Sequence, residues 1–135
     1  MQIAKRESDA VVEFLREQIP GLRSVHLFGS RATGDWTSAS DVDISVLGER
    51  PLEPLDLFRI AADLTVFLGA EVDLVDLRNV STLLKYKIVT EGIRLWALDW
   101  RSEDYELAAL REKFDWDIQS REHRAEILRS GNVRG

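Results

Sequence analysis

Two short polar motifs, each attached to an apolar run, constrain the fold of this chain most strongly. Gly29 and Ser30 directly follow one apolar run, and Asp41 and Asp43 open the next one. The ten residues between the motifs, 31–40, are mostly small or polar. Short apolar runs bounded by turn-forming residues are typical of buried strands. We therefore expect a strand that ends in a turn, a loop whose start can form a helical turn, and a second strand with an acidic beginning.

A third acidic residue, Asp73, lies inside the later apolar run 71–77. A buried carboxylate without a partner is costly, so a carboxylate in such a run is unusual. Alternate side chains of a strand face opposite sides of the sheet. If this strand lies next to the strand of Asp43, Asp73 reaches the same side, whereas Asp76, three residues on, faces the other.

Hydrophobic periodicity predicts an α/β chain in which helices and strands alternate. The expected helices cover residues 5–19, 55–68, 80–91 and 102–128, and the expected strands cover 25–28, 41–47, 71–77 and 93–98, the last being a strand or an extended segment. Gly92 suits the end of a helix, and the acidic residues after Ser102 suit the start of one. The polar tail 130–135 is expected to be frayed.

Length and composition exclude several classes of protein. A chain of 135 residues, of which 44% are hydrophobic, predicts a single domain over residues 1–135. No apolar stretch approaches the roughly 20 residues of a membrane span, and the N-terminus lacks the apolar region of a signal peptide, so we expect a cytoplasmic protein. The absence of cysteine excludes disulfides and thiolate metal sites. The net charge of -6 makes direct nucleic-acid binding an unfavoured function.

The acidic residues have the chemistry of a divalent-cation site. Asp41 and Asp43 project from the same side of a strand, and their carboxylates repel each other unless a cation lies between them. Mg²⁺ is the natural cation, because it takes hard oxygen ligands and keeps positions for phosphate oxygens. Asp73 would complete the metal ligands or take the proton from an incoming hydroxyl. A pair of metal ions is common in displacement at phosphorus.

Gly29 and Ser30 have the features of a phosphate-binding turn. Gly29 has no Cβ where a phosphate must approach the main chain. Ser30 offers a hydroxyl and an N–H, and a helical turn that begins there would present further N–H groups. Arg31 could add positive charge or face solvent. Together with the carboxylates, this turn predicts transfer of a nucleotidyl group from a metal-bound nucleoside triphosphate.

A few other side chains are candidates for minor roles. Lys85 and Lys87 could contact the triphosphate, and His26 is expected to be structural. Trp36 could stack on adenine or pack on its own domain.

The C-terminal helix is the expected partner surface. The last third of the chain is rich in aromatic residues. Among them, Trp116 lies off the main apolar stripe of the helix and is the preferred interface candidate. Leu110 and Phe114 are expected to pack this helix against the sheet.

The motif set resembles the nucleotidyltransferase superfamily of DNA polymerase beta type. The residues that carry the resemblance are Gly29-Ser30, Asp41-Val42-Asp43 and Asp73, over roughly residues 10–98. Its small single-domain form, the minimal nucleotidyltransferase, matches best. This branch implies a mixed sheet flanked by helices, with ATP as substrate and two Mg²⁺ ions at the carboxylates.

The resemblance also implies a role for each matching residue. By position, Gly29 and Ser30 match the phosphate-binding turn, Asp41 and Asp43 the metal pair, and Asp73 the third carboxylate. The chain length is similar to that of minimal nucleotidyltransferase antitoxins, which pair with HEPN-domain ribonuclease toxins. Such antitoxins transfer AMP to a toxin tyrosine, so a HEPN-type toxin is the implied partner.

Two alternatives remain at this point. One is an enzyme that modifies a small molecule such as an aminoglycoside, since an acidic cleft attracts a cationic sugar. The other is an antitoxin without catalysis that masks its toxin sterically through the C-terminal helix.

Overall fold

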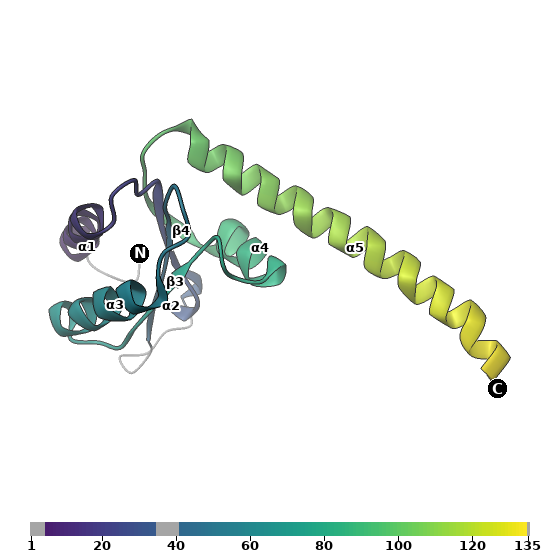
Figure 1. Ribbon diagram of the computed structural model, residues 1–135. Coiled ribbons are helices and arrows are strands. Elements are labelled where there is room, and N and C mark those ends of the chain that lie inside the picture. The colour runs from purple at the N-terminus through teal and green to yellow at the C-terminus, as the bar shows by residue number, and fades with distance from the viewer. Residues whose placement is uncertain (1–4, 35–40, 135) are drawn as a thin grey trace.

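The computed structural model describes residues 5–34 and 41–134, with side chains described as far as residue 128. Five helices and four strands alternate along these residues (Figure 1). The helices are α1 (Lys5–Gln18), α2 (Ser30–Thr33), α3 (Pro54–Leu68), α4 (Thr82–Glu91) and α5 (Trp100–Arg134), and the strands are β1 (Ser24–Phe28), β2 (Val42–Leu47), β3 (Val72–Asp76) and β4 (Ile93–Ala97).

The four strands form one mixed sheet in the order β3-β2-β1-β4. β1 pairs antiparallel with β2 and with β4, whereas β2 and β3 are parallel. The parallel pair requires a crossover, and α3 supplies it. This architecture confirms the expected α/β class with a mixed sheet flanked by helices, and it shows that residues 93–97 are a strand.

The two faces of the sheet have different neighbours. α1 and α3 cover one face and bury the main hydrophobic core (Figure 1). A smaller cluster on the other face joins the sheet to α4 and to the start of α5. The main core includes Val11, Leu15, Val25, Leu27, Ile44, Val46, Ile60 and Leu64, and the smaller cluster is centred on Leu47, Leu77 and Ile88.

The C-terminal helix differs most from its prediction. α5 begins at Trp100 and continues to Arg134, so the expected frayed tail is helical. Figure 1 shows that its first part lies beside α4 and that its last part extends away from the sheet. Phe114 is 63% exposed, so the prediction that it packs on the sheet is wrong. The helix has moved away from the sheet by that residue, a divergence that periodicity alone cannot reveal.

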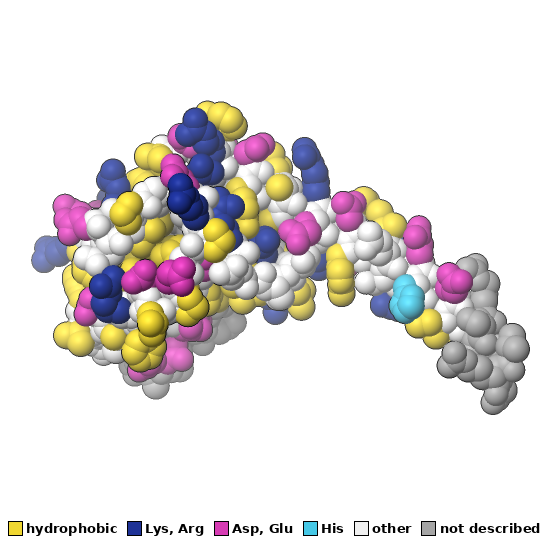
Figure 2. All heavy atoms as spheres, viewed as in Figure 1, with side chains coloured by type: hydrophobic (Ala, Val, Ile, Leu, Met, Phe, Trp, Pro, Cys, Tyr) yellow, Lys and Arg dark blue, Asp and Glu magenta, His cyan; other side chains and the backbone are white. Residues whose placement is uncertain are grey.

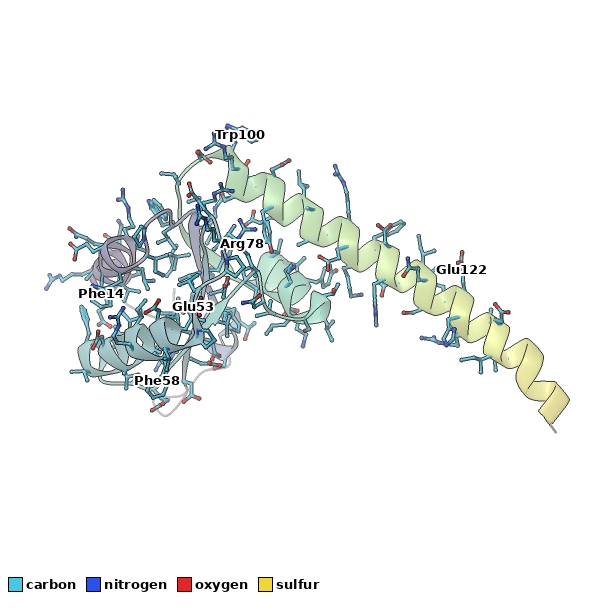
Figure 3. All side chains as sticks on the ribbon, in the orientation of Figure 1. Phe14, Glu53, Phe58, Arg78, Trp100 and Glu122 are labelled. Atoms are coloured by element: carbon cyan, nitrogen blue, oxygen red, sulfur yellow. The ribbon has the colours of Figure 1, made fainter. Side chains whose placement is uncertain are left out.

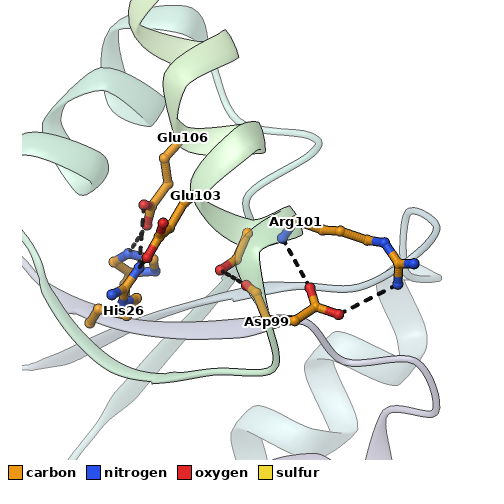
Figure 4. A network of polar contacts seen from close by, with 7 residues as sticks. His26, Asp99, Arg101, Glu103 and Glu106 are labelled. Atoms are coloured by element: carbon orange, nitrogen blue, oxygen red, sulfur yellow. Dashed lines mark hydrogen bonds and ion pairs between the residues drawn. The ribbon is translucent and has the colours of Figure 1, made fainter.

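Polar contacts hold α5 on the body. The carboxylate of Glu106 on α5 lies 2.7 Å from Nε2 of the buried His26 on β1 (Figure 4). Arg94 on β4 forms ion pairs with both Glu106 and Glu103. Burial lowers the pKa of His26, an effect that the neighbouring Glu106 opposes. The ring is therefore neutral near pH 7 and donates from Nε2 to Glu106. His26 is structural, as the sequence predicted.

A second link joins α5 to α4. The hydroxyl of Thr82 donates to Glu112 (3.0 Å), and Lys85 forms an ion pair with the same carboxylate (3.4 Å).

Among the residues that the structure describes, no helix combines the length and the apolar character that a membrane crossing needs.

We expect Glu106→Ala to lower the free energy of unfolding by about 1–3 kcal/mol at pH 7.5, because it leaves a buried ring N–H without its acceptor. Glu103→Ala is the matched control, since the side chain of Glu103 is 62% exposed and forms a longer ion pair with Arg94, at 3.5 Å. Glu103→Ala should lower the free energy of unfolding by less than about 0.5 kcal/mol. Urea unfolding of both variants measures the difference, and equal losses would contradict the anchoring role of Glu106.

Candidate active site

The register of the sheet brings two of the predicted carboxylates side by side. Asp43 on β2 and Asp73 on β3 are directly paired positions of the parallel ladder. Paired positions of neighbouring strands direct their side chains to the same face. Asp41 lies just before β2, two residues from Asp43, and is exposed, as is Asp73. The structure therefore places Asp43 between the other two, partly buried.

On its other side, Asp43 lies against the Gly29 turn. Phe28, the last residue of β1, is the antiparallel partner of Asp43, and Gly29 follows it. A Cβ on Gly29 would collide with Oδ2 of Asp43. Gly29 also has φ 72° and ψ -155°, a combination open to essentially no other residue. Only glycine fits here, because both the backbone angles and the contact with the carboxylate exclude a side chain.

The helical turn expected after Gly29 is present. α2 begins at Ser30, and its first turn directs the N–H groups of Ala32 and Thr33 to the carbonyl of Gly29, at 3.0 and 3.2 Å. Gly34 ends the turn in the left-handed conformation. Gly29 and Ser30 thus connect the end of β1 to α2, directly above the carboxylate of Asp43.

Negative charge is concentrated at Asp43. Burial, then the neighbouring carboxylates of Asp73 and Asp41, raise the pKa of Asp43 to about 6. A pKa this far above the ordinary value of 3.8 means that ionised Asp43 is unfavourable without a compensating positive charge. A divalent cation between these carboxylates would supply that charge, so the donor set suits a hard cation such as Mg²⁺.

The carboxylates do not form a closed three-ligand cluster. In the described ranges 5–34 and 41–134, no group of three or more His, Cys, Asp or Glu side chains is placed so that it could hold a metal ion together. The fit to a cation rests on the adjacent pair Asp43 and Asp73 and on the raised pKa. A cation bound by this pair would keep coordination positions for phosphate oxygens, because Mg²⁺ in nucleotide sites is bound by one or two carboxylates and by the phosphates of the substrate.

The three basic candidates, Arg31, Lys85 and Lys87, have different surroundings. Arg31 is buried rather than solvent-facing. Lys85 is largely covered and paired with Glu112, so it stabilises the α4–α5 contact. Lys87 instead lines a pocket of about 240 Å³ beside the turn. The full lining of this pocket is Phe28, Gly29, Thr33, Leu84, Lys87 and Glu91.

Sequence reasoning missed Leu84 and Glu91 as members of this pocket. Their spacing from Lys87 places all three on one face of a helix, which was the available signal. Only the packing of α4 near the end of β1 brings that face to Gly29. Trp36, the candidate adenine-stacking residue, lies outside the described residues.

Asp76 faces the opposite side of the sheet from Asp73, as strand alternation predicts. It is buried, and its carboxylate accepts hydrogen bonds from the N–H of Leu52 (2.8 Å) and of Arg78 (3.0 Å). The bond from Leu52 connects the end of β3 to the segment that leads into α3, whereas the bond from Arg78 closes the turn after β3.

Comparison with known proteins identifies the family. The family described as polymerase beta, nucleotidyltransferase, matches residues 10–101. The chain belongs to this nucleotidyltransferase family. It is 39% identical over 101 residues to the protein adenylyltransferase MntA of Shewanella oneidensis, a match that covers 75% of this chain and 70% of MntA.

Solved structures of toxin–antitoxin complexes contain similar chains. One, a toxin–antitoxin with AMP-PNP, matches with a TM-score of 0.81 and 30% identity over 90% of this chain and 98% of that chain. Another is a tri-AMPylated HEPN toxin of Shewanella oneidensis in complex with its MNT antitoxin, with a TM-score of 0.76 and 29% identity over 95% and 99% of the two chains. The shared structure therefore extends beyond the nucleotidyltransferase family match.

We expect Gly29→Ala to abolish nucleotidyl transfer and to destabilise the protein, because the new Cβ displaces the Asp43 carboxylate. Gly69→Ala is the control: Gly69 also has a positive φ, of 67°, but no atom lies within 4 Å of the Cβ position. The control should cost only about 1–2 kcal/mol of stability and keep the activity. Transfer assays beside thermal melts separate the two effects, and an active Gly29→Ala enzyme would refute the close contact.

The pKa of Asp43 gives a pH-dependent prediction for the metal-free protein. Because the folded pKa of about 6 exceeds 3.8, protonation of Asp43 favours folding. This contribution is complete below about pH 4 and is lost as the pH rises through 6. We expect Asp43→Asn to exceed the wild type in stability by about 1 kcal/mol at pH 8, after allowance for solvent screening.

The two proteins should converge at pH 4, and Mg²⁺ at pH 8 should stabilise the wild type more than the variant. Denaturant unfolding at both pH values, with and without Mg²⁺, measures these differences. A stability difference that is the same at pH 4 and pH 8 would show that the charge of Asp43 is not its cause.

Proposed function

We propose that this protein is an adenylyltransferase that transfers AMP from ATP to a hydroxyl of a partner protein, a tyrosine of a HEPN-type RNase toxin, and so acts as the antitoxin. The observation that carries the proposal is the row formed by Gly29, Asp43 and Asp73 at one end of the sheet. The likeness to MntA, a protein adenylyltransferase, supports AMP as the transferred group. The likeness to toxin–antitoxin complexes supports a toxin as the acceptor.

In this proposal, the turn and the pocket beside it bind ATP. Gly29 and Ser30 hold the phosphates along the main chain, and the buried Arg31 on α2 contributes positive charge near the turn. Lys87 lies in the pocket next to Gly29 and adds a cationic side chain that can meet a phosphate. The adjacent carboxylates of Asp43 and Asp73 would hold Mg²⁺, with Asp41 as a further ligand, and the complete site would take two ions. The bound Mg²⁺ neutralises charge on the triphosphate and on the pyrophosphate that leaves.

Asp73 has a second proposed task, which is to receive the acceptor hydroxyl. It is exposed at the sheet edge, whereas Asp43 is partly buried beside the turn. Asp73 takes the proton of the acceptor hydroxyl, whose oxygen forms a bond to the α-phosphorus, while the bond from that phosphorus to the bridging oxygen breaks and pyrophosphate leaves. Positioning and charge neutralisation supply most of the rate enhancement.

The exposed part of α5 is the proposed contact with the toxin. Trp116 is 52% exposed, and Phe114 adds a second exposed aromatic side chain. Further exposed apolar residues on this helix are Leu107, Ile127 and Leu128. Aromatic side chains are enriched in protein interfaces. A cytoplasmic location belongs to the same proposal, because ATP is supplied there.

Intact mass of a HEPN-type toxin co-expressed with this chain tests the function. We expect the mass to rise by one AMP or a small multiple with the wild type and not with the Asp41→Asn/Asp43→Asn double variant. Asp63→Asn, an exposed aspartate on α3, is the matched control and should behave as the wild type.

An unmodified toxin that still forms a stable complex with both proteins would favour steric masking. Transfer of AMP to an aminoglycoside but not to the toxin would favour the small-molecule alternative. Either result would refute protein adenylylation.

A further inference from the structure

A groove runs along the outer side of β3, beneath α3. Its volume is about 560 Å³, and its lining is mostly apolar. Asp73 belongs to the lining, so the groove reaches the candidate active site. The lining residues from α3 are Pro54, Leu57, Phe58, Ala61, Ala62 and Thr65, and those from the β3 region are Glu71, Val72, Asp73 and Leu74.

The main chain of β3 is available for pairing along this groove. β3 is an edge strand, and no other strand of the described residues pairs with its outer side. The carbonyl of Glu71 accepts from Val42 and the N–H of Leu77 donates to Val46, so alternate residues starting at 71 bond to β2. In a parallel ladder the residues between them direct their N–H and C=O groups outward.

Two of these outward groups are already bonded. At the end of β3 the C=O of Asp76 accepts from the N–H of Asn79 (2.9 Å). The N–H of Val72 donates to the hydroxyl of Thr65 (3.1 Å), which closes one end of the groove. The N–H and C=O of Leu74 are directed to the open edge, next to Asp73. Unpaired edge groups of this kind bind an extended peptide as an additional strand.

Side chains of an added strand would reach both faces of the sheet. Val72 and Leu74 are buried towards α3, whereas Asp73 faces the side that Asp43 occupies. An added strand shares this alternation, so the residue beside Asp73 faces the carboxylates and its two neighbours face the groove. The apolar groove and the acidic site would thus contact the side chains of adjacent residues in one segment.

We propose that the protein acceptor binds here as an extended segment paired with the edge of β3, with its tyrosine beside Asp73 and the flanking apolar side chains in the groove. This inference rests on the proposed function and names where its acceptor binds. Neighbouring strands lie about 4.8 Å apart, so Asp43 lies roughly 10 Å from an added strand. Only a long side chain brings its hydroxyl across Asp73 towards Asp43, which selects tyrosine over serine.

The surface around the groove supports an apolar occupant. Figure 2 shows hydrophobic side chains gathered over α3, and Figure 3 shows Phe58 projecting from this helix. Phe58 lines the groove while remaining 76% exposed. A large aromatic side chain at the rim of an apolar groove typically marks an interaction site.

Two substitutions on one helix test the groove. Phe58→Glu places a charge at its rim, and Leu55→Glu places the same charge at a residue that is 82% exposed and outside the lining. With purified unmodified toxin as acceptor, we expect Phe58→Glu to raise the KM for the toxin about tenfold or more. Leu55→Glu should change it less than about twofold. The KM for ATP and the melting temperature should stay near wild-type values in both.

A second pair tests the strand pairing itself. Leu74→Pro removes the outward N–H without removing a bond to β2, and proline is tolerated at such edge positions. Leu74→Ala removes the same apolar contacts but keeps the N–H. We expect toxin modification to fall at least about tenfold more in the proline variant than in the alanine variant, with ATP affinity retained by both.

The outcomes separate the two proposals. Transfer by the wild type with the same toxin KM in Phe58→Glu and Leu55→Glu would overturn the groove while leaving the function intact. Equal transfer by Leu74→Pro and Leu74→Ala would overturn strand pairing. An absence of transfer to the toxin by the wild type itself would overturn the proposed function.

Discussion

The carboxylate of Asp43 is held between a glycine that follows one neighbouring strand and a second carboxylate on the other neighbouring strand. Antiparallel pairing sets Phe28 and then Gly29 beside it, and parallel pairing sets Asp73 beside it. A side chain at Gly29 would occupy the position of that carboxylate. The same crowding raises the pKa of Asp43, so the metal-free protein keeps a charge conflict at the point where a cation would be bound.

The mixed sheet makes this arrangement possible by dividing tasks between its faces. The α1 and α3 face buries most of the apolar side chains and supplies stability. In the part of the chain that the structure describes, α4 and the start of α5 pack on the opposite face. Its exposed end therefore leaves room for polar groups, and α4 brings Lys87 next to the phosphate-binding turn. The long α5 is held by Glu106 and Glu112 near its beginning, and its remainder is available to a partner.

Much of the fold follows from local patterns. The strands around Asp43 and Asp73 were expected within about two residues of their bounds, because apolar runs, glycines and prolines mark their ends. The predicted face of Asp76 was also correct, since strand periodicity decides it. Phe114 and the C-terminal tail were placed wrongly. Periodicity identifies an apolar stripe but does not say whether a neighbouring element covers it, and α5 leaves the sheet before Phe114.

The sequence by itself determined the elements, the candidate carboxylates and the requirement for glycine at the turn, because these depend on spacing along the chain and on side-chain chemistry. Tertiary structure decided what lies beside them. Strand order made Asp43 and Asp73 direct neighbours. The packing of α4 against α5 and β1 separated the roles of Lys85 and Lys87, and Arg31 is buried in the folded protein. It also left β3 at an edge beneath α3 with a groove that reaches Asp73. These features arise from packing between segments distant in the chain, and local periodicity carries no information about such contacts.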